Sequence, residues 1–170
     1  MKRSGRTIMQ RLNDLSYLPS YIGRARYFRG HGVHSPYIYA IVRQVFMRRG
    51  LYDESCTLYT ELVERGVAKR RAEELTNLVW HCGYKSWSID VMGRSDIIFA
   101  TLDTRYPDLE QYADYARGIG ATLCIMNPYN NRERWQTCCR IIDNHPSTTV
   151  DNRAYLLVFN NHLPKQRFCL

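Results

Sequence analysis

Hydrophobic residues recur at helical spacing in the first half of the chain. One stripe follows the pattern i, i+3, i+4, i+7, i+8 and consists of Ile38, Ile41, Val42, Val45 and Phe46. Ser35 is suited to cap the start of this helix, and Pro36 fits its first turn, where a missing N–H costs nothing. Gly50 is suited to end it. The pattern therefore predicts an amphipathic helix that begins at Pro36.

Two further stretches predict helices. Apolar positions within residues 8–15 repeat at helical spacing, and Pro19 ends that pattern. Residues 57–81 predict one or two helices, with a break at Gly66. The first half of the chain should thus be helical.

The period changes after Gly83, where short apolar runs alternate with helical stripes. Such alternation is typical of an α/β fold with a mainly parallel sheet, here of about four to five strands and with one antiparallel edge. The expected strands are 87–91, 96–102, 122–126, 148–151 and 155–159, and the expected helices lie around 109–116 and 135–142. The last two strands, joined at Asn152-Arg153, should form an antiparallel hairpin.

The link between the first two expected strands is short. Residues 92–95 alone separate 87–91 from 96–102. Parallel neighbours ordinarily need a crossover of about a dozen residues. We therefore predict that these segments are not parallel neighbours: they should form an antiparallel hairpin, or the first should not belong to the sheet.

Charge is unevenly distributed. The first 50 residues carry a net charge of +9 and the remainder −1, which together give the +8 of the whole chain. A basic, tyrosine-containing segment suits phosphate contact and base stacking on nucleic acid; its candidate residues are Arg24, Arg26, Tyr27 and Arg29. Two alternatives remain open, namely that the tyrosines pack internally beside a solvated arginine face, or that a basic helix lies on an anionic membrane surface.

The composition favours a single globular domain inside the cell. Apolar runs are too short to span a bilayer, and no apolar segment follows the basic start as in a signal peptide. Six cysteines without C-x-x-C spacing predict free thiols. We expect a cytoplasmic protein with one domain over 1–170, whose basic part (1–83) is helical and whose remainder (84–170) is α/β.

His31 and His34 stand at a spacing that could bring two imidazoles near one metal ion. Zinc sites use three or four protein ligands, and no suitable cysteine or histidine stands nearby in the sequence. We predict no metal site here and interpret His34, Ser35 and Pro36 as the turn that starts a helix.

Two stretches resemble a known family. Residues 29–39 (RGHGVHSPYIY) resemble the G-[IV]-H-S-P-F-[VI]-[FY] segment that opens a group of bacterial class I S-adenosylmethionine-dependent methyltransferases. The chain also ends as they do, with a Trp135 helix, a strand ending in Asp151, the strand YLLVF and a K-Q-x-F tail. This resemblance implies a partial Rossmann-like methyltransferase sheet behind N-terminal helices.

The middle of the chain departs from the family. The resemblance implies a glycine-rich cofactor loop after the first strand and an acid ending the second, but Val91 is followed by the single Gly93. Two strands with their helices are missing by comparison, and Thr101 stands where an aspartate is expected. If S-adenosylmethionine is bound at all, the residues left to hold it are Asp90, Gly93, Asp96 and Asp103.

The leading functional hypothesis is a methyltransferase-like protein without catalysis or cofactor that acts as an interaction module. Removing half of a sheet exposes a strand edge, which favours pairing with a second copy of the chain or with a paralogue. An active methyltransferase with a rebuilt site and a small basic RNA-binding protein are the alternatives. The sequence does not identify a substrate.

Overall fold

The computed structural model describes residues 33–170. The helix expected at 8–15 lies outside these residues. So do the candidate nucleic-acid contacts and the first histidine of the motif, namely Arg24, Arg26, Tyr27, Arg29 and His31.

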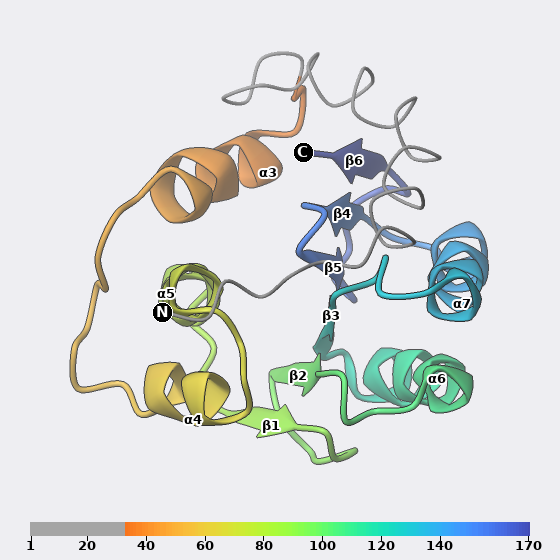
Figure 1. Ribbon diagram of the computed structural model, residues 1–170. Helices are drawn as coiled ribbons and strands as arrows, with labels where there is room; N and C mark the ends of the chain where they lie inside the picture. The colour runs from red at the N-terminus through yellow and green to blue at the C-terminus, as the bar shows by residue number, and fades with distance from the viewer. Residues whose placement is uncertain (1–32) are drawn as a thin grey trace, which may run out of the picture.

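A six-stranded mixed sheet forms the centre of the described region (Figure 1). Its strands in chain order are β1 (Trp87–Ile89), β2 (Ile97–Ala100), β3 (Thr122–Met126), β4 (Thr149–Asp151), β5 (Tyr155–Val158) and β6 (Arg167–Cys169). In space they lie in the order β1-β2-β3-β5-β4-β6. β5 alone runs against its neighbours, because β1, β2 and β3 pair in parallel and β4 pairs in parallel with β6.

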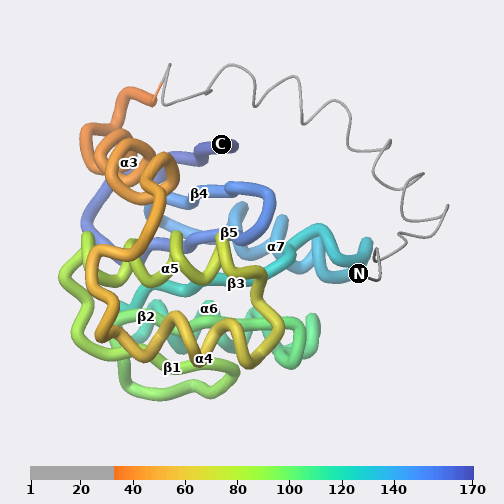
Figure 2. The backbone as a smooth tube through the Cα atoms, turned by 60° about the vertical axis from the view of Figure 1, so that its left-hand side comes forward, coloured from red at the N-terminus to blue at the C-terminus, as the bar shows by residue number. Residues whose placement is uncertain are grey.

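Helices cover both faces of this sheet (Figures 1 and 2). One face carries α6 (Leu109–Ile119), preceded by the short helix η3 (Tyr106–Asp108), and α7 (Arg132–Asn144). The other carries α3 (Pro36–Ile41), continued by the π-helical turn η2 (Val42–Phe46), with α4 (Leu58–Glu64) and α5 (Lys69–His81). The predicted α/β class is thus confirmed. The elements form three layers, with the sheet between two layers of helices.

The molecule has a hydrophobic core on each face of the sheet, and the strands contribute side chains to both. Successive side chains of a strand point to opposite faces, so β2 sends Ile98 toward α6 and α7 while Phe99 packs with the helices of the other layer. Every residue of β2, β3 and β5 is buried. Central strands covered on both faces read as continuous apolar runs, as these do.

The predicted helix start at Ser35 and the predicted break at Gly66 are confirmed. The Ser35 hydroxyl accepts a hydrogen bond from the backbone N–H of Ile38 (3.4 Å), and Pro36 occupies the first turn of α3. Gly66 (φ 80°) separates α4 from α5, and Gly120 (φ 73°) caps the end of α6. Gly50 also has positive φ, but the helix has already ended at Phe46. Its π-helical last turn was not predicted.

The prediction for the first two strands is wrong. β1 and β2 are parallel neighbours, with Trp87 beside Ile97 and Ile89 beside Phe99. The crossover rule applies to strands of ordinary length, whereas β1 has three residues and spans only about 10 Å. The connecting residues 90–96 can reach roughly 20 Å when extended, so they return to the start of β2 without a helix.

The connecting loop also covers the free edge of β1. It lies on the side of β1 away from β2 (Figure 1), and the hydroxyls of Ser88 and Ser95 are hydrogen bonded at 3.0 Å. The sheet edge that was expected to be open is therefore shielded in part by the chain's own loop.

The C-terminal hairpin is confirmed, with a different position in the sheet. β4 and β5 are antiparallel, with Asp151 beside Leu156, and Arg153 in their turn has φ 68°. The antiparallel strand β5 is not at the edge, because it lies between β3 and β4. The edge strand on this side of the sheet, opposite β1, is β6. This sixth strand was not predicted.

Within the described residues, no helix has the length and apolar character that crossing a membrane requires. All six cysteines are free thiols, as predicted.

Candidate functional site

The carboxyl ends of β1, β2 and β3 meet at one edge of the sheet, because these strands run in the same direction. Ligands of open α/β sheets bind in the crevice outside such strand ends. Asp90, Thr101 and Asn127 directly follow the three strands. This edge is therefore the place to look for a site.

Asp90 is tied to the chain that follows β2. Its Oδ1 accepts hydrogen bonds from the Thr101 N–H (2.7 Å) and the Thr104 hydroxyl (2.6 Å). Its Oδ2 accepts from the Thr101 hydroxyl (2.7 Å) and from the Arg65 guanidinium (3.2 Å). A carboxylate offers about four lone-pair sites. All of them are occupied by protein donors.

The backbone of Asp90 is held as firmly as its side chain. Its φ of 57° is in the left-handed region, which aspartate tolerates better than most residues. Its N–H donates to the Phe99 carbonyl (2.8 Å), and its carbonyl accepts from the Tyr112 hydroxyl (2.7 Å). Asp90, the residue that follows β1, is therefore hydrogen bonded to both β2 and α6.

Arg134 fills the neighbouring position at the ends of β2 and β3. Its guanidinium donates to the carbonyls of Thr104 (2.9 Å), Thr101 (2.9 Å) and Met126 (3.0 Å) and, at 3.4 Å, to that of Ala100. The residue is only 2% exposed. Its Nε also donates to the Met126 carbonyl at 3.2 Å. A buried arginine thus joins two strand ends through main-chain acceptors.

The start of α7 positions this arginine. Asn131 caps the helix, and its side-chain oxygen accepts a hydrogen bond from the Arg134 N–H (2.7 Å). Arg134 therefore lies in the first turn, where it faces the sheet. Burial lowers the pKa of its guanidinium, and the nearby Cys138 and Asp90 oppose that shift. Arginine stays protonated in proteins, so a positive charge remains at this edge.

The side chains of the other residues predicted to bind cofactor make no hydrogen bond to Asp90 within the described residues. Gly93 packs on β1, because a Cβ built on it would lie 3.2 Å from the Ser88 Cβ. Asp103 is exposed in the turn after β2, and its N–H donates to the Thr101 hydroxyl (3.2 Å). Its backbone, at least, belongs to the Asp90 cluster.

Asp96 lies at the opposite end of β1. Its carboxylate accepts hydrogen bonds from the N–H groups of Lys85 (2.7 Å) and Ser86 (2.9 Å), just before the strand. The hydrogen bond from Lys85 is the main reason that the pKa of Asp96 is below its ordinary value. Asp96 and Asp90 are separated by the length of β1, so they cannot hold the same part of a ligand.

The histidine motif is seen only in part. His34 is exposed, and the residues that follow it start α3 as predicted. Among residues 33–170, no group of three or more histidine, cysteine or acidic side chains could hold a metal ion.

Sequence reasoning missed Thr101, Thr104, Tyr112 and Arg134. One signal for Arg134 was present. It precedes Cys138 by four residues and so lies on the buried stripe of α7, where an arginine needs internal partners. The threonines and Tyr112 carry no comparable signal, because their partners are remote in sequence.

Comparisons with known proteins give no relative: no family model, no curated protein and no solved structure matches the chain.

Proposed function

We propose that this protein is a non-catalytic, methyltransferase-like interaction module that associates with a second copy of itself. The observation that carries the proposal is that polar side chains at the carboxyl ends of β1 to β3 are bonded to the protein itself. Asp90 and Arg134 are charged groups there that are bonded to residues of the protein itself.

Asp90 is one of the residues that the family resemblance leaves to hold S-adenosylmethionine. To accept a hydrogen bond from such a ligand, it must give up a bond from Thr101, Thr104 or Arg65. The bonds from the two threonines are partly buried, and a typical intramolecular hydrogen bond contributes about 0.5–1.5 kcal/mol net. Losing that contribution subtracts from any affinity for a ligand.

Arg134 acts against a ligand in a second way. Its guanidinium lies against the carbonyls at the ends of β2 and β3, where a doubly wound sheet would place its ligand. Withdrawing it would leave a buried charge and several main-chain acceptors unpaired. The alternative of an active methyltransferase also requires Asp90 and Asp96 to cooperate from opposite ends of β1.

Exposed apolar side chains beside this edge support the association. They lie on the two segments that the Asp90 hydrogen bonds hold together, after β1 and after β2, the second of which includes the start of η3. We call them the loop patch: Val91, Met92, Leu102 and Tyr106. Exposed apolar surface is typical of sites of protein association.

The decisive experiment is a calorimetric titration of the full chain with S-adenosylmethionine. We expect no binding heat at ligand concentrations up to about 1 mM, which corresponds to a binding free energy weaker than about −4 kcal/mol. Micromolar affinity would overturn the proposal. If such affinity also fell on Asp103→Asn, the rebuilt-site alternative would replace it.

A further inference from the structure

A cavity on the other helical layer has features of a small-molecule site. Its volume is about 520 Å³, within the range of roughly 300–1,000 Å³ usual for such sites. It lies between α5, the segment before α4, and the start of β1. Its lining combines aromatic and polar side chains, including Asp53, Thr76, Trp80, Tyr84, Lys85 and Trp87.

A three-layer stack forms one wall of this cavity. The Trp80 and Tyr52 rings are stacked, with centroids 4.3 Å apart and planes inclined by 15°. The Arg48 guanidinium carbon lies 3.7 Å from the same Tyr52 centroid. Two groups so close to one ring centre must occupy its opposite faces. Trp80 is therefore the outer layer of the stack, and it is 56% exposed.

The middle layer of the stack is fixed before any ligand arrives. The Tyr52 N–H donates to the side chain of Asn77 (2.8 Å), which in turn donates to the Gly50 carbonyl (2.9 Å). The Tyr52 hydroxyl donates to the Gln44 carbonyl (2.9 Å) in the π-helical turn. A ring held at both ends gives Trp80 a rigid support, which reduces the entropy lost on binding.

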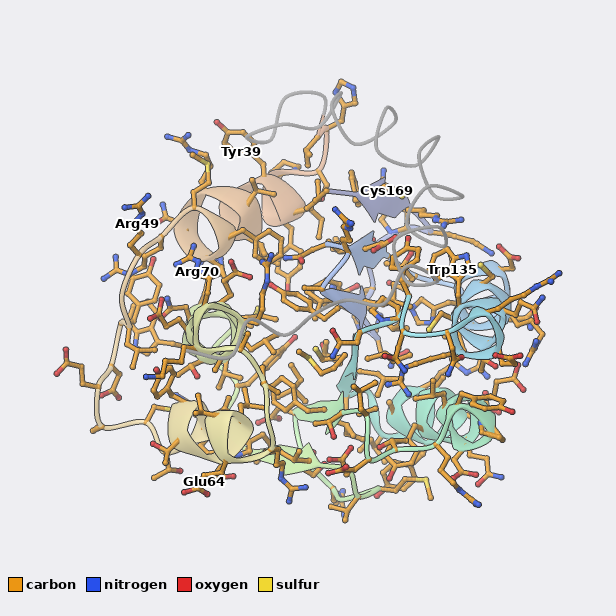
Figure 3. The ribbon with its side chains drawn as sticks, viewed as in Figure 1. Tyr39, Arg49, Glu64, Arg70, Trp135 and Cys169 are labelled. Atoms are coloured by element: carbon orange, nitrogen blue, oxygen red, sulfur yellow. The ribbon has the colours of Figure 1, made fainter. Side chains whose placement is uncertain are left out.

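Arg70 strengthens the same region. It lies between α5 and the end of η2 (Figure 3), and its guanidinium donates to the Phe46 carbonyl (2.9 Å). The π-helical turn and α5, which supply Gln44 and Asn77, are thereby joined. The stack of Arg48, Tyr52 and Trp80 is therefore supported by elements that are hydrogen bonded to one another.

Thr76 lies in the cavity wall, and its hydroxyl has no protein partner. The residue is 2% exposed, and its Oγ1, with less than 1 Å² of accessible surface, makes no hydrogen bond to any described residue. Buried hydroxyls are nearly always paired. An unpaired hydroxyl therefore lies just beneath the wall of the cavity that the exposed, supported indole also lines.

We propose that this cavity binds a planar heteroaromatic base of the purine type. The base would stack on the indole of Trp80. A change of the Thr76 rotamer, of which threonine has two in helices, would turn the covered Oγ1 toward a ring nitrogen or exocyclic group of the base. A hydrocarbon ring could stack but would leave Thr76 unpaired, whereas an aliphatic polar ligand would not use the indole. This site belongs to the layer of α3 to α5, so it does not depend on the function proposed above.

A free nucleoside and a base of single-stranded nucleic acid share this chemistry. The experiment is calorimetric titration of the full chain with adenosine and, separately, with a single-stranded oligodeoxyadenylate. Binding of adenosine alone identifies a nucleoside site. Binding of the oligomer with an affinity that falls steeply with salt identifies a nucleic-acid site. Failure of both probes to bind at millimolar concentration overturns the proposal.

Three variants test the assignment of residues. Trp80→Ala should weaken binding by about five- to a hundredfold, the range expected for loss of base stacking. Thr76→Val should weaken binding while leaving the melting temperature unchanged or higher, because it removes an unpaired buried hydroxyl at nearly constant volume. Tyr39→Ala, an exposed aromatic on α3 outside the cavity, is the control and should bind as the unmodified chain does. Equal affinities for Trp80→Ala and Tyr39→Ala would refute the site.

Discussion

Arg134 is a single residue on which two strand ends depend. Arginines are seldom buried without a carboxylate partner, yet the hydrogen bonds of this guanidinium to the described residues go to main-chain carbonyls. Five N–H donors in a planar fork suit several divergent acceptors at once. The side chain thus serves as a structural cross-link.

Replacing Arg134 should therefore destabilise the fold. We expect Arg134→Met to lower the free energy of unfolding by about 3–5 kcal/mol, because it leaves several buried carbonyls unpaired. Arg134→Lys should recover little of this loss, since an ammonium cannot reach the same acceptors. Urea denaturation followed by circular dichroism measures both.

Arg132 provides the matched control in the same turn of α7. It is exposed, so Arg132→Met should change the stability by no more than about 0.5 kcal/mol. Equal losses for the two methionine variants would show that the buried hydrogen bonds of Arg134 contribute nothing.

At the residue scale, the sequence predicted what depends on near neighbours. Ser35 and Gly66 act through backbone within a few residues, and their roles were predicted correctly. The hydrogen bonds of Asp90 join it to three other parts of the chain, at Arg65, at Thr101 and Thr104, and at Tyr112. Because spacing along a sequence says nothing about such contacts, Asp90 was assigned to a cofactor rather than to Thr101 and Thr104.

At the scale of elements, periodicity predicted type and order, whereas pairing required the structure. β3 was predicted with its observed bounds, since five consecutive buried residues give a strong signal. β6 was missed because three residues at an edge give almost no periodic signal in the sequence. It is a strand because it pairs with β4. The error about β1 and β2 arose because a rule for full-length strands was applied to a strand of three residues.

Asp96 joins the starts of these two parallel strands, and its contribution should depend on pH. Hydrogen bonds from Lys85 and Ser86 lower its pKa in the folded chain below the ordinary value of 3.8. A lowered folded pKa gives stability that is present above the unfolded pKa and is lost as pH falls through the folded value. Asp96→Asn should thus be less stable than the unmodified chain above about pH 4.

The difference between the two proteins should shrink below that pH, as the unmodified carboxylate is protonated. Thermal unfolding across pH 2.5–6 measures it. A stability difference that stays constant over this range would mean that the charge of Asp96 has no part in holding the turn before β1.

At the scale of the whole molecule, the three layers leave one apolar surface near the sheet edge. The loop 90–96 lies beside the edge of β1 (Figure 1), and its residues Val91 and Met92 are exposed. Leu102 and Tyr106 extend the same loop patch after β2. A loop that protects a strand edge from pairing while presenting apolar side chains favours association through side chains over extension of the sheet.

Self-association through the loop patch is therefore expected, and one substitution should abolish it. Met92→Asp places a charge in the patch, where burial in an interface would be costly. Met47→Asp is the matched control, because Met47 has similar exposure (39% against 47%) but lies beyond the end of η2 on the other layer. Light scattering over a concentration series should show dimers for the unmodified chain and for Met47→Asp, and monomers for Met92→Asp. Since both methionines are exposed, neither variant should alter the melting temperature of the monomer, so a change of assembly can be separated from unfolding. A monodisperse monomer for the unmodified chain at high concentration would contradict the expected dimer.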